Sequence, residues 1–105
     1  MDDRELLEFA AKSHGGIDYY KISSEGMHLK GGGVWSPLQN GGDALRLAVA
    51  LQLEIRPGTG AVSVSNICYR DPLSFVWYDG NPNAATRRAI VKAAARIWQE
   101  TNNDQ

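Results

Sequence analysis

The sequence predicts an α+β fold, in which three helices pack with a small antiparallel sheet in a layered, α/β/α-like sandwich. Apolar residues recur at helical spacing near both ends and in the middle, and aromatic and β-branched runs lie in consecutive sets between them. The resulting order, α-β(β)-α-β-β-β-α, favours α+β over a doubly wound parallel sheet. A chain of 105 residues has room for one core, so we expect residues 1–105 to form a single domain.

The N-terminal part predicts a helix followed by a β-hairpin. The helix, from Asp2 or Asp3 to Ser13, is indicated by apolar spacing, and the glycines after His14 end it. Residues 17–22 favour a strand because they are mostly aromatic or β-branched, and residues 27–29 can return beside it across a turn. Residues 31–42 are rich in Gly, Pro and Asn and predict a loop.

A second helix is predicted from Asp43 to Gln52, with Asn40 or Asp43 offering the N-cap oxygen. Apolar residues cover most of its circumference and leave Arg46 and Gln52 as the polar exceptions. A helix of this kind is packed on more than one side, so we expect it to be the most buried helix of the domain.

Three strands and a final helix are predicted in the C-terminal half. Residues 53–56 and 61–69 read as strands joined by a hairpin turn at Gly58-Thr59-Gly60, and residues 73–78 pair with the second of them. Asn81 is a good N-cap, with Pro82 at the first helical position, for a helix that runs to about Glu100. Residues 1–2 and 101–105 are expected to fray.

Charge and motifs argue against several functions. Eleven Lys and Arg against twelve Asp and Glu give a net charge of −1, whereas a dedicated duplex-DNA binder carries a basic excess. The sequence contains no HxxxH, CxxC or DxD, no Gly-x-Ser-x-Gly turn, and no glycine loop that continues into Lys-Ser/Thr. We therefore expect no enzyme activity, no metal and no cofactor. The three glycines at residues 31–33 are either a plain connection or a mobile lid over a ligand.

Cys68 and the N-terminal composition bear on location. Cys68 is the only cysteine and lies in an apolar, alternating run, so we expect a partly buried, unreactive thiol. The acidic N-terminus lacks the apolar segment of a signal peptide, and no apolar run approaches the ~20 residues that span a bilayer. The expected location is the cytoplasm, with no membrane partner.

A cationic ridge on the last helix is the first surface that could bind a partner. Arg88, Lys92 and Arg96 lie at i, i+4 and i+8 and therefore share one helix face, with Arg87 beside them. The ridge is either a solvated outer face or a site for an anion or an acidic partner.

Aromatic residues form the second candidate surface. Phe75 and Trp77 share one face of their strand, and Val76 and Tyr78 share the other. Such rings either belong to the core or mark an interface. Trp35 also has two possible roles: it can cover the second helix as an apolar lid, or it can stack on a ligand.

The motif Trp35-x-Pro37, followed by Gly42-Asp43-Ala44-Leu45, resembles short phage and prophage proteins of the phage ABA-sandwich type. The leading RELLEFAAK and closing ATRRAIVKAAA segments extend this resemblance from Arg4 to Ile97. It implies a phage or prophage origin, the cytoplasm of a bacterial host and an accessory role, and it carries over no activity.

These features lead to three hypotheses of decreasing weight. The first is a non-enzymatic phage accessory protein that binds a host or phage protein through the ridge or the aromatic face. The second is a binder of a small anionic ligand such as a nucleotide, held by Arg87, Arg88 and Lys92 and stacked on Trp35. The third is weak nucleic-acid binding. An exposed sheet face would also favour a homodimer.

Overall fold

The structure, a computed structural model, describes residues 2–102 and contains three helices and six strands. The predicted α+β class is confirmed. In chain order the elements are α1 (Asp3–His14), β1 (Tyr19–Ser23), β2 (Gly26–Leu29), β3 (Val34–Trp35), α2 (Gly41–Ala50), β4 (Leu53–Pro57), β5 (Ala61–Asn66), β6 (Ser74–Trp77) and α3 (Pro82–Asn102).

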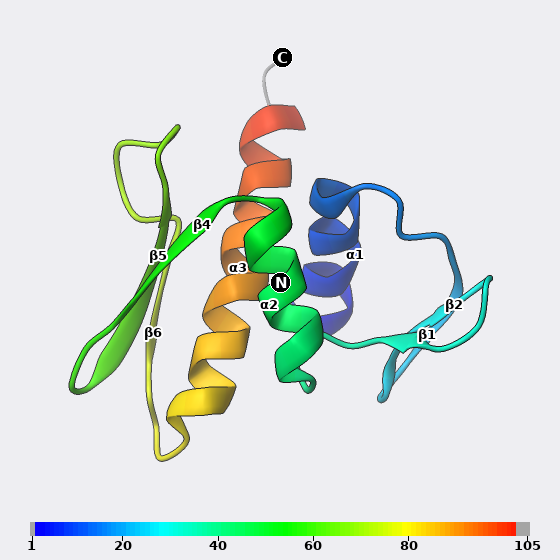
Figure 1. Cartoon of the computed structure of the whole chain (residues 1–105), viewed down its shortest axis with the longest axis horizontal. Helices are drawn as coiled ribbons and strands as arrows, with labels where there is room; N and C mark the ends of the chain where they lie inside the picture. The colour runs from blue at the N-terminus through cyan, green and yellow to red at the C-terminus, as the bar shows by residue number, and fades with distance from the viewer. Residues whose placement is uncertain (1, 103–105) are drawn as a thin grey trace.

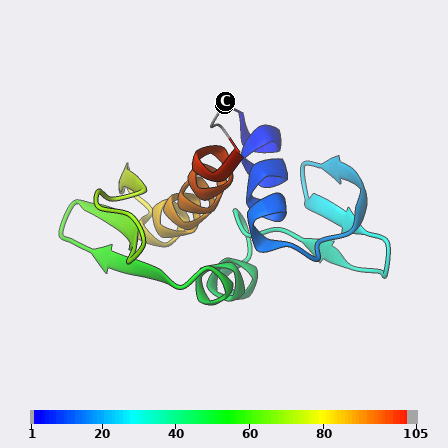
Figure 2. The ribbon, with the colours of Figure 1, turned by 90° about the horizontal axis from the view of Figure 1, so that it is seen from above.

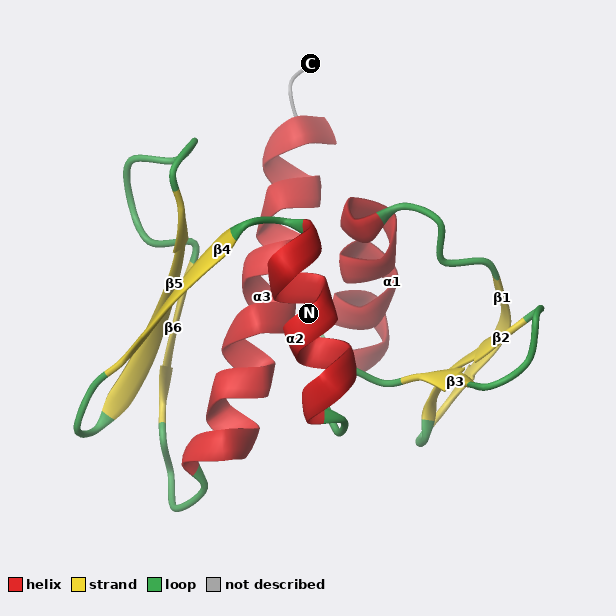
Figure 3. Ribbon diagram, viewed as in Figure 1, coloured by secondary structure: helices red, strands yellow, loops and turns green. Residues whose placement is uncertain are grey.

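The strands form two antiparallel sheets rather than one. The N-terminal sheet has the order β1-β2-β3 and the C-terminal sheet the order β4-β5-β6. Figures 1 and 3 show the helices in the middle of the molecule, with one sheet on either side. The layers therefore differ from an α/β/α arrangement. The physical reason is local: each set of three strands pairs through short hairpins, and α2 separates the two sets.

Helix α1 begins with a capping box and packs against α3. Asp2, expected to fray, accepts the backbone N–H of Glu5, and the Glu5 side chain accepts the N–H of Asp2. Ala10 on α1 and Ala89 and Ala93 on α3 are fully buried, so the small side chains let the two helices approach closely. Residues 1 and 103–105, also expected to fray, lie outside the described residues.

The first hairpin forms as predicted, and a third short strand joins it. Ser23 pairs with Gly26 at the turn, and Met27 pairs with Trp35 across the next strand boundary. The prediction that residues 31–42 form a loop throughout is therefore wrong, because Val34–Trp35 form a strand. A strand of two residues is too short to show an alternating pattern, which explains why β3 was missed.

The prediction that α2 is the most buried helix is wrong. Leu45 and Val49 on this helix are 59% and 68% exposed. Its N-cap is Asn40, which is one of the two residues that the sequence offers for this position. In the part of the chain that the structure describes, no sheet covers the side of α2 that carries Leu45 and Val49 (Figure 2), so its second apolar face is exposed to solvent. Helix α3 is the central helix instead. It contacts both other helices and the C-terminal sheet, and it buries a long run of alanine, isoleucine and valine.

The C-terminal sheet contains both predicted hairpins. Gly58–Gly60 turn between β4 and β5, and β5 pairs with β6 in an antiparallel register. Val62 and Val64 are fully buried toward α3. Cys68, expected to be partly buried, is exposed, because the strand ends at Asn66 and the chain turns away before Cys68.

Helix α3 starts where the sequence predicts. Asn81 Oδ1 accepts the backbone N–H of Ala84, and Pro82 is the first helical residue. The helix continues to Asn102, two residues beyond the predicted end at Glu100. A difference of this size is within the usual uncertainty of helix ends.

Candidate functional site

Both arginines of the cationic ridge are hydrogen-bonded to carboxylates. Arg88 donates two hydrogen bonds from Nη2 to the Asp3 carboxylate, at 3.0 and 3.2 Å. Arg96 donates from Nε to Glu100 at 2.9 Å, one turn further along α3. These pairs are largely solvent-exposed and neutralise part of the positive charge that the sequence pattern predicts.

The other two cations of this surface differ from each other. Arg87 Nε donates to the backbone carbonyl of Leu38 at 3.0 Å and so ties α3 to the segment before α2. Lys92 is exposed, and among residues 2–102 its ammonium has no ion-pair partner. Lys92 is thus the ridge cation best placed to meet an external anion.

Trp35 and its motif lie in the interior. Trp35 is 6% exposed and meets the His14 ring edge-on, with ring centroids 6.1 Å apart. Pro37 is fully buried, and the Ser36 backbone N–H donates to Asp43 Oδ2 at 2.9 Å. The motif therefore joins the loop to α2 and holds Trp35 in the core. The structure does not bring the face of its ring to the surface beside the arginines.

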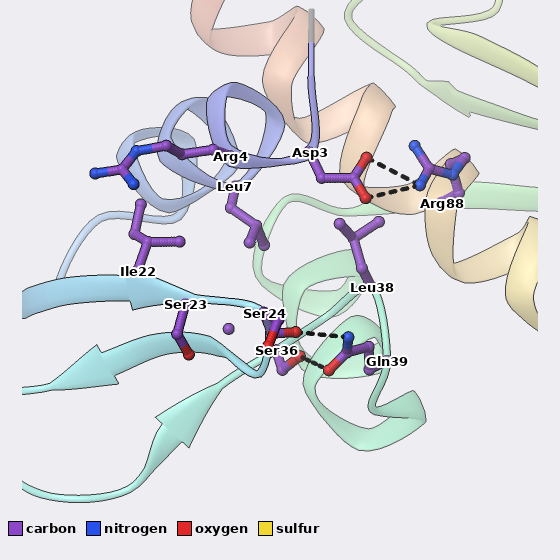
Figure 4. A pocket seen from close by; sticks show the side chains of 11 residues that line it. Asp3, Arg4, Leu7, Ile22, Ser23, Ser24, Ser36, Leu38, Gln39 and Arg88 are labelled. Atoms are coloured by element: carbon purple, nitrogen blue, oxygen red, sulfur yellow. Dashed lines mark hydrogen bonds and ion pairs between the residues drawn. The ribbon is translucent and has the colours of Figure 1, made fainter.

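A pocket of about 400 Å³ lies between α1, the turn of the first hairpin and the segment before α2 (Figure 4). Leu7 and Leu38 supply apolar surface, and the charged residues of its lining are Asp3, Arg4 and Arg88. Gln39 closes one side, because its Nε2 donates to the Ser24 carbonyl while its Oε1 accepts from Ser36 Oγ. Its volume is within the range of small-molecule sites, and its lining combines apolar and charged groups.

The outer face of the C-terminal sheet carries two exposed aromatic rings. Phe75 and Trp77 are 55% and 69% exposed, and their rings meet edge-on with centroids 5.1 Å apart. Ser63 and Ala61 lie opposite them on β5 and are too small to cover them. Tyr78 points to the other face and is half-buried, with its hydroxyl donated to the Gly58 carbonyl at 2.8 Å.

The sequence pattern places these aromatic residues on one strand but does not decide whether their rings lie in the core or at the surface. The deciding signal is the alternation of β5, in which Val62, Val64 and Asn66 are buried. Their cross-strand partners Val76 and Ser74 must share that inner face, which leaves Phe75 and Trp77 outside. The pocket of Figure 4 was not foreseen, because its lining comes from four segments far apart in the sequence.

The described residues offer neither a metal site nor a membrane-spanning helix. Within residues 2–102, no group of three or more His, Cys, Asp or Glu side chains converges in a way that could hold a metal ion. None of the helices in this part of the chain is long and apolar enough to cross a bilayer. Comparison with known proteins finds no family model, no curated protein and no solved structure that matches the chain.

Proposed function

We propose that this chain is a phage or prophage accessory protein that acts without catalysis, by binding a host or phage protein through the outer face of the C-terminal sheet. The observation that carries the proposal is the exposed, edge-on pair of Phe75 and Trp77. The phage setting, in the cytoplasm of a bacterial host, rests on the resemblance of the Trp35-x-Pro37 motif.

The aromatic face supports this role better than the cationic ridge. Large aromatic side chains are enriched among the residues that dominate binding energy at protein interfaces. Burial of the exposed rings at an interface also contributes more binding free energy than contacts made by the arginines. Arg88 and Arg96 would first have to give up their ion pairs with Asp3 and Glu100.

Capture experiments with matched variants test the proposal. The tagged protein and a Phe75→Ser/Trp77→Ser variant are exposed to a lysate of bacterial cells, and bound proteins are quantified. The matched control is Tyr20→Ser, which removes a 63% exposed ring from the N-terminal sheet. We expect specific capture to fall at least tenfold with the double variant only. Capture that is unchanged by the double variant, or lost only with Lys92→Glu, contradicts the proposal.

A second candidate function is the binding of a small anionic ligand, and the pocket beside α1 favours it. Its lining includes Arg4, which has no ion-pair partner among residues 2–102, and the hydroxyl-bearing Ser23 and Ser36. Arg88 also lines the pocket, where Asp3 already holds it. A ligand at 100 times its dissociation constant should stabilise the fold by about 2.7 kcal/mol. A thermal-shift series with inorganic phosphate and nucleotides tests this, with Arg4→Ala as the variant and Arg56→Ala as the control. The absence of any shift would remove this candidate.

A further inference from the structure

The strand β6 is a sheet edge whose backbone groups are available. Tyr78 N–H donates to the Gly60 carbonyl at 3.1 Å, so residues 78, 76 and 74 direct their backbone groups toward β5. Hydrogen bonding alternates along an antiparallel pair, and the N–H and C=O groups of Phe75 and Trp77 therefore point to the free edge. The two residues with exposed rings are also the two with free backbone groups.

The other sheet edges carry features that oppose strand addition, and β6 does not. On β4, Glu54 and Arg56 are exposed and charged, and Pro57 lacks an N–H. On β1, Lys21 is exposed and the register is interrupted between Tyr19 and Lys21. Charges, proline, bulges and very short strands are the usual devices that protect an edge. Within the described residues, β6 is the edge strand of more than two residues without one.

A hollow lies beside β6, and a helix lies near the opposite edge of the same sheet. A hollow of about 270 Å³, lined in part by Val76, Trp77, Ala84 and Arg88, lies between β6 and the first turns of α3. Helix α2 lies on the opposite, β4 side of the sheet (Figure 2).

We infer that β6 pairs antiparallel with β6 of a second copy of the chain, which joins the two C-terminal sheets into one six-stranded sheet. The sequence of the strand is complementary to itself in one register. Centred on Val76, this register places Phe75 of each copy opposite Trp77 of the other. Phe75 and Trp77 of the two copies then form hydrogen-bonded antiparallel pairs, in which each residue donates its N–H and accepts with its C=O. The two N–H and two C=O groups on the edge of each strand are therefore all hydrogen-bonded.

The same register brings the exposed rings together. Residues directly opposite each other share a face of the sheet, so the Phe75–Trp77 pairs of the two copies form one aromatic cluster across the symmetry axis. Shifting the register by two residues leaves one ring of each copy without an aromatic residue directly opposite it on the other copy. A second copy therefore satisfies the free backbone groups and the exposed rings at once. An unrelated strand would satisfy the backbone groups without supplying the matching rings.

The inference deepens the proposed function, because the paired sheet would offer a partner twice the aromatic surface. The two can fail separately. The dimer is measured on the purified protein with no partner present, whereas the proposed function is measured by capture. A monomer whose capture depends on Trp77 refutes the dimer alone, and a dimer that captures nothing refutes the proposed function alone.

Sedimentation of the purified protein up to about 1 mM is the first test. We expect a concentration-dependent dimer, and we expect Phe75→Lys to raise its dissociation constant at least tenfold, because a lysine on the edge opposes strand pairing. The control Ser65→Lys adds the same charge to the outer face of the central strand, opposite Glu54, and should leave the dimer intact. Circular dichroism verifies that both variants are folded.

Disulfide cross-linking tests the register directly. In a Cys68→Ser background, Val76→Cys should form an intermolecular disulfide on oxidation. The two Val76 residues would face each other as a non-hydrogen-bonded antiparallel pair, whose Cα atoms lie about 4.5 Å apart. Phe75→Cys should cross-link at least tenfold less, since it lies opposite residue 77 of the partner. The inference is overturned by a monomer at every concentration, by a dimer that is insensitive to Phe75→Lys, by loss of the dimer in Ser65→Lys, or by equal cross-linking of the two cysteine variants.

Discussion

The backbone N–H of Ser36 is held by the Asp43 carboxylate at 2.9 Å, and both residues are buried. The other carboxylate oxygen, Oδ1, accepts from the mostly exposed Arg46 at 2.7 Å. One side chain thus fastens the loop that carries Trp35 to the first turn of α2. The Trp35-x-Pro37 and Gly-Asp-Ala-Leu segments therefore form a single structural unit, in which Trp35 belongs to the core.

Removing this carboxylate should destabilise the fold. We expect Asp43→Ala to lower the free energy of unfolding by about 1.5–3 kcal/mol, because a buried N–H loses a charged acceptor. Arg46→Ala removes only the exposed partner and should cost less than about 1 kcal/mol. Urea unfolding of the two variants checks this, and equal losses would show that the Ser36 bond contributes nothing of its own.

Gly26 should not tolerate a side chain. Its φ is +131°, and a Cβ there would lie 2.7 Å from both Ser36 Cβ and the Trp35 carbonyl oxygen. Gly26→Ala should therefore cost about 2–3 kcal/mol. The control is Gly31→Ala, because a Cβ at Gly31 would meet no atom within 4 Å and its φ is not positive. This substitution should change stability by less than about 0.5 kcal/mol. Thermal unfolding of both variants is the measurement.

The two faces of α2 should respond differently to the same substitution. Leu47 is fully buried and Leu45 is 59% exposed. Leu47→Ala should cost about 2–5 kcal/mol, through lost burial and a cavity. Leu45→Ala should stay within about 0.5 kcal/mol. Similar losses at both positions, measured by denaturant unfolding, would mean that the outer face of α2 is covered in solution.

Cys68 should react with a thiol reagent in the folded protein. Its side chain is exposed, and its backbone N–H donates to Asn66 Oδ1 at 2.7 Å, which keeps the turn in place. We expect complete labelling by a disulfide reagent without denaturant, and we expect Cys68→Ser to change stability by less than about 0.5 kcal/mol. Labelling that requires denaturant would place the thiol in the interior.

The helices, hairpins and caps were predictable because their signals are local. The capping oxygen of Asn81, the turn at Gly58–Gly60 and the spacing of Leu6, Leu7, Ala10 and Ala11 each depend on neighbours in the sequence. The burial of α2 was not predictable in this way. An apolar face predicts a covering layer only if the fold supplies one, and no element within residues 2–102 covers Leu45 or Val49.

The candidate site was only partly predictable for a related reason. The pattern of α3 identified Arg88 as one of a row of cations, but its acid, Asp3, is 85 residues away. Arg87 likewise bonds a carbonyl 49 residues away. Phe75 and Trp77 were assigned correctly to one strand face. Which face looks outward depends on the sheet that forms and on the helix that covers it.

The packing of α1 against α3 has a consequence for the order of events during synthesis. Helix α1 is made first, but the surface that buries Leu6, Ala10 and Ala11 belongs largely to the last helix of the domain. Chain synthesis proceeds at about 5–20 residues per second, so several seconds pass between the synthesis of α1 and that of α3. During that interval its apolar face is open to chaperones, so folding of this domain should finish only once α3 has left the ribosome.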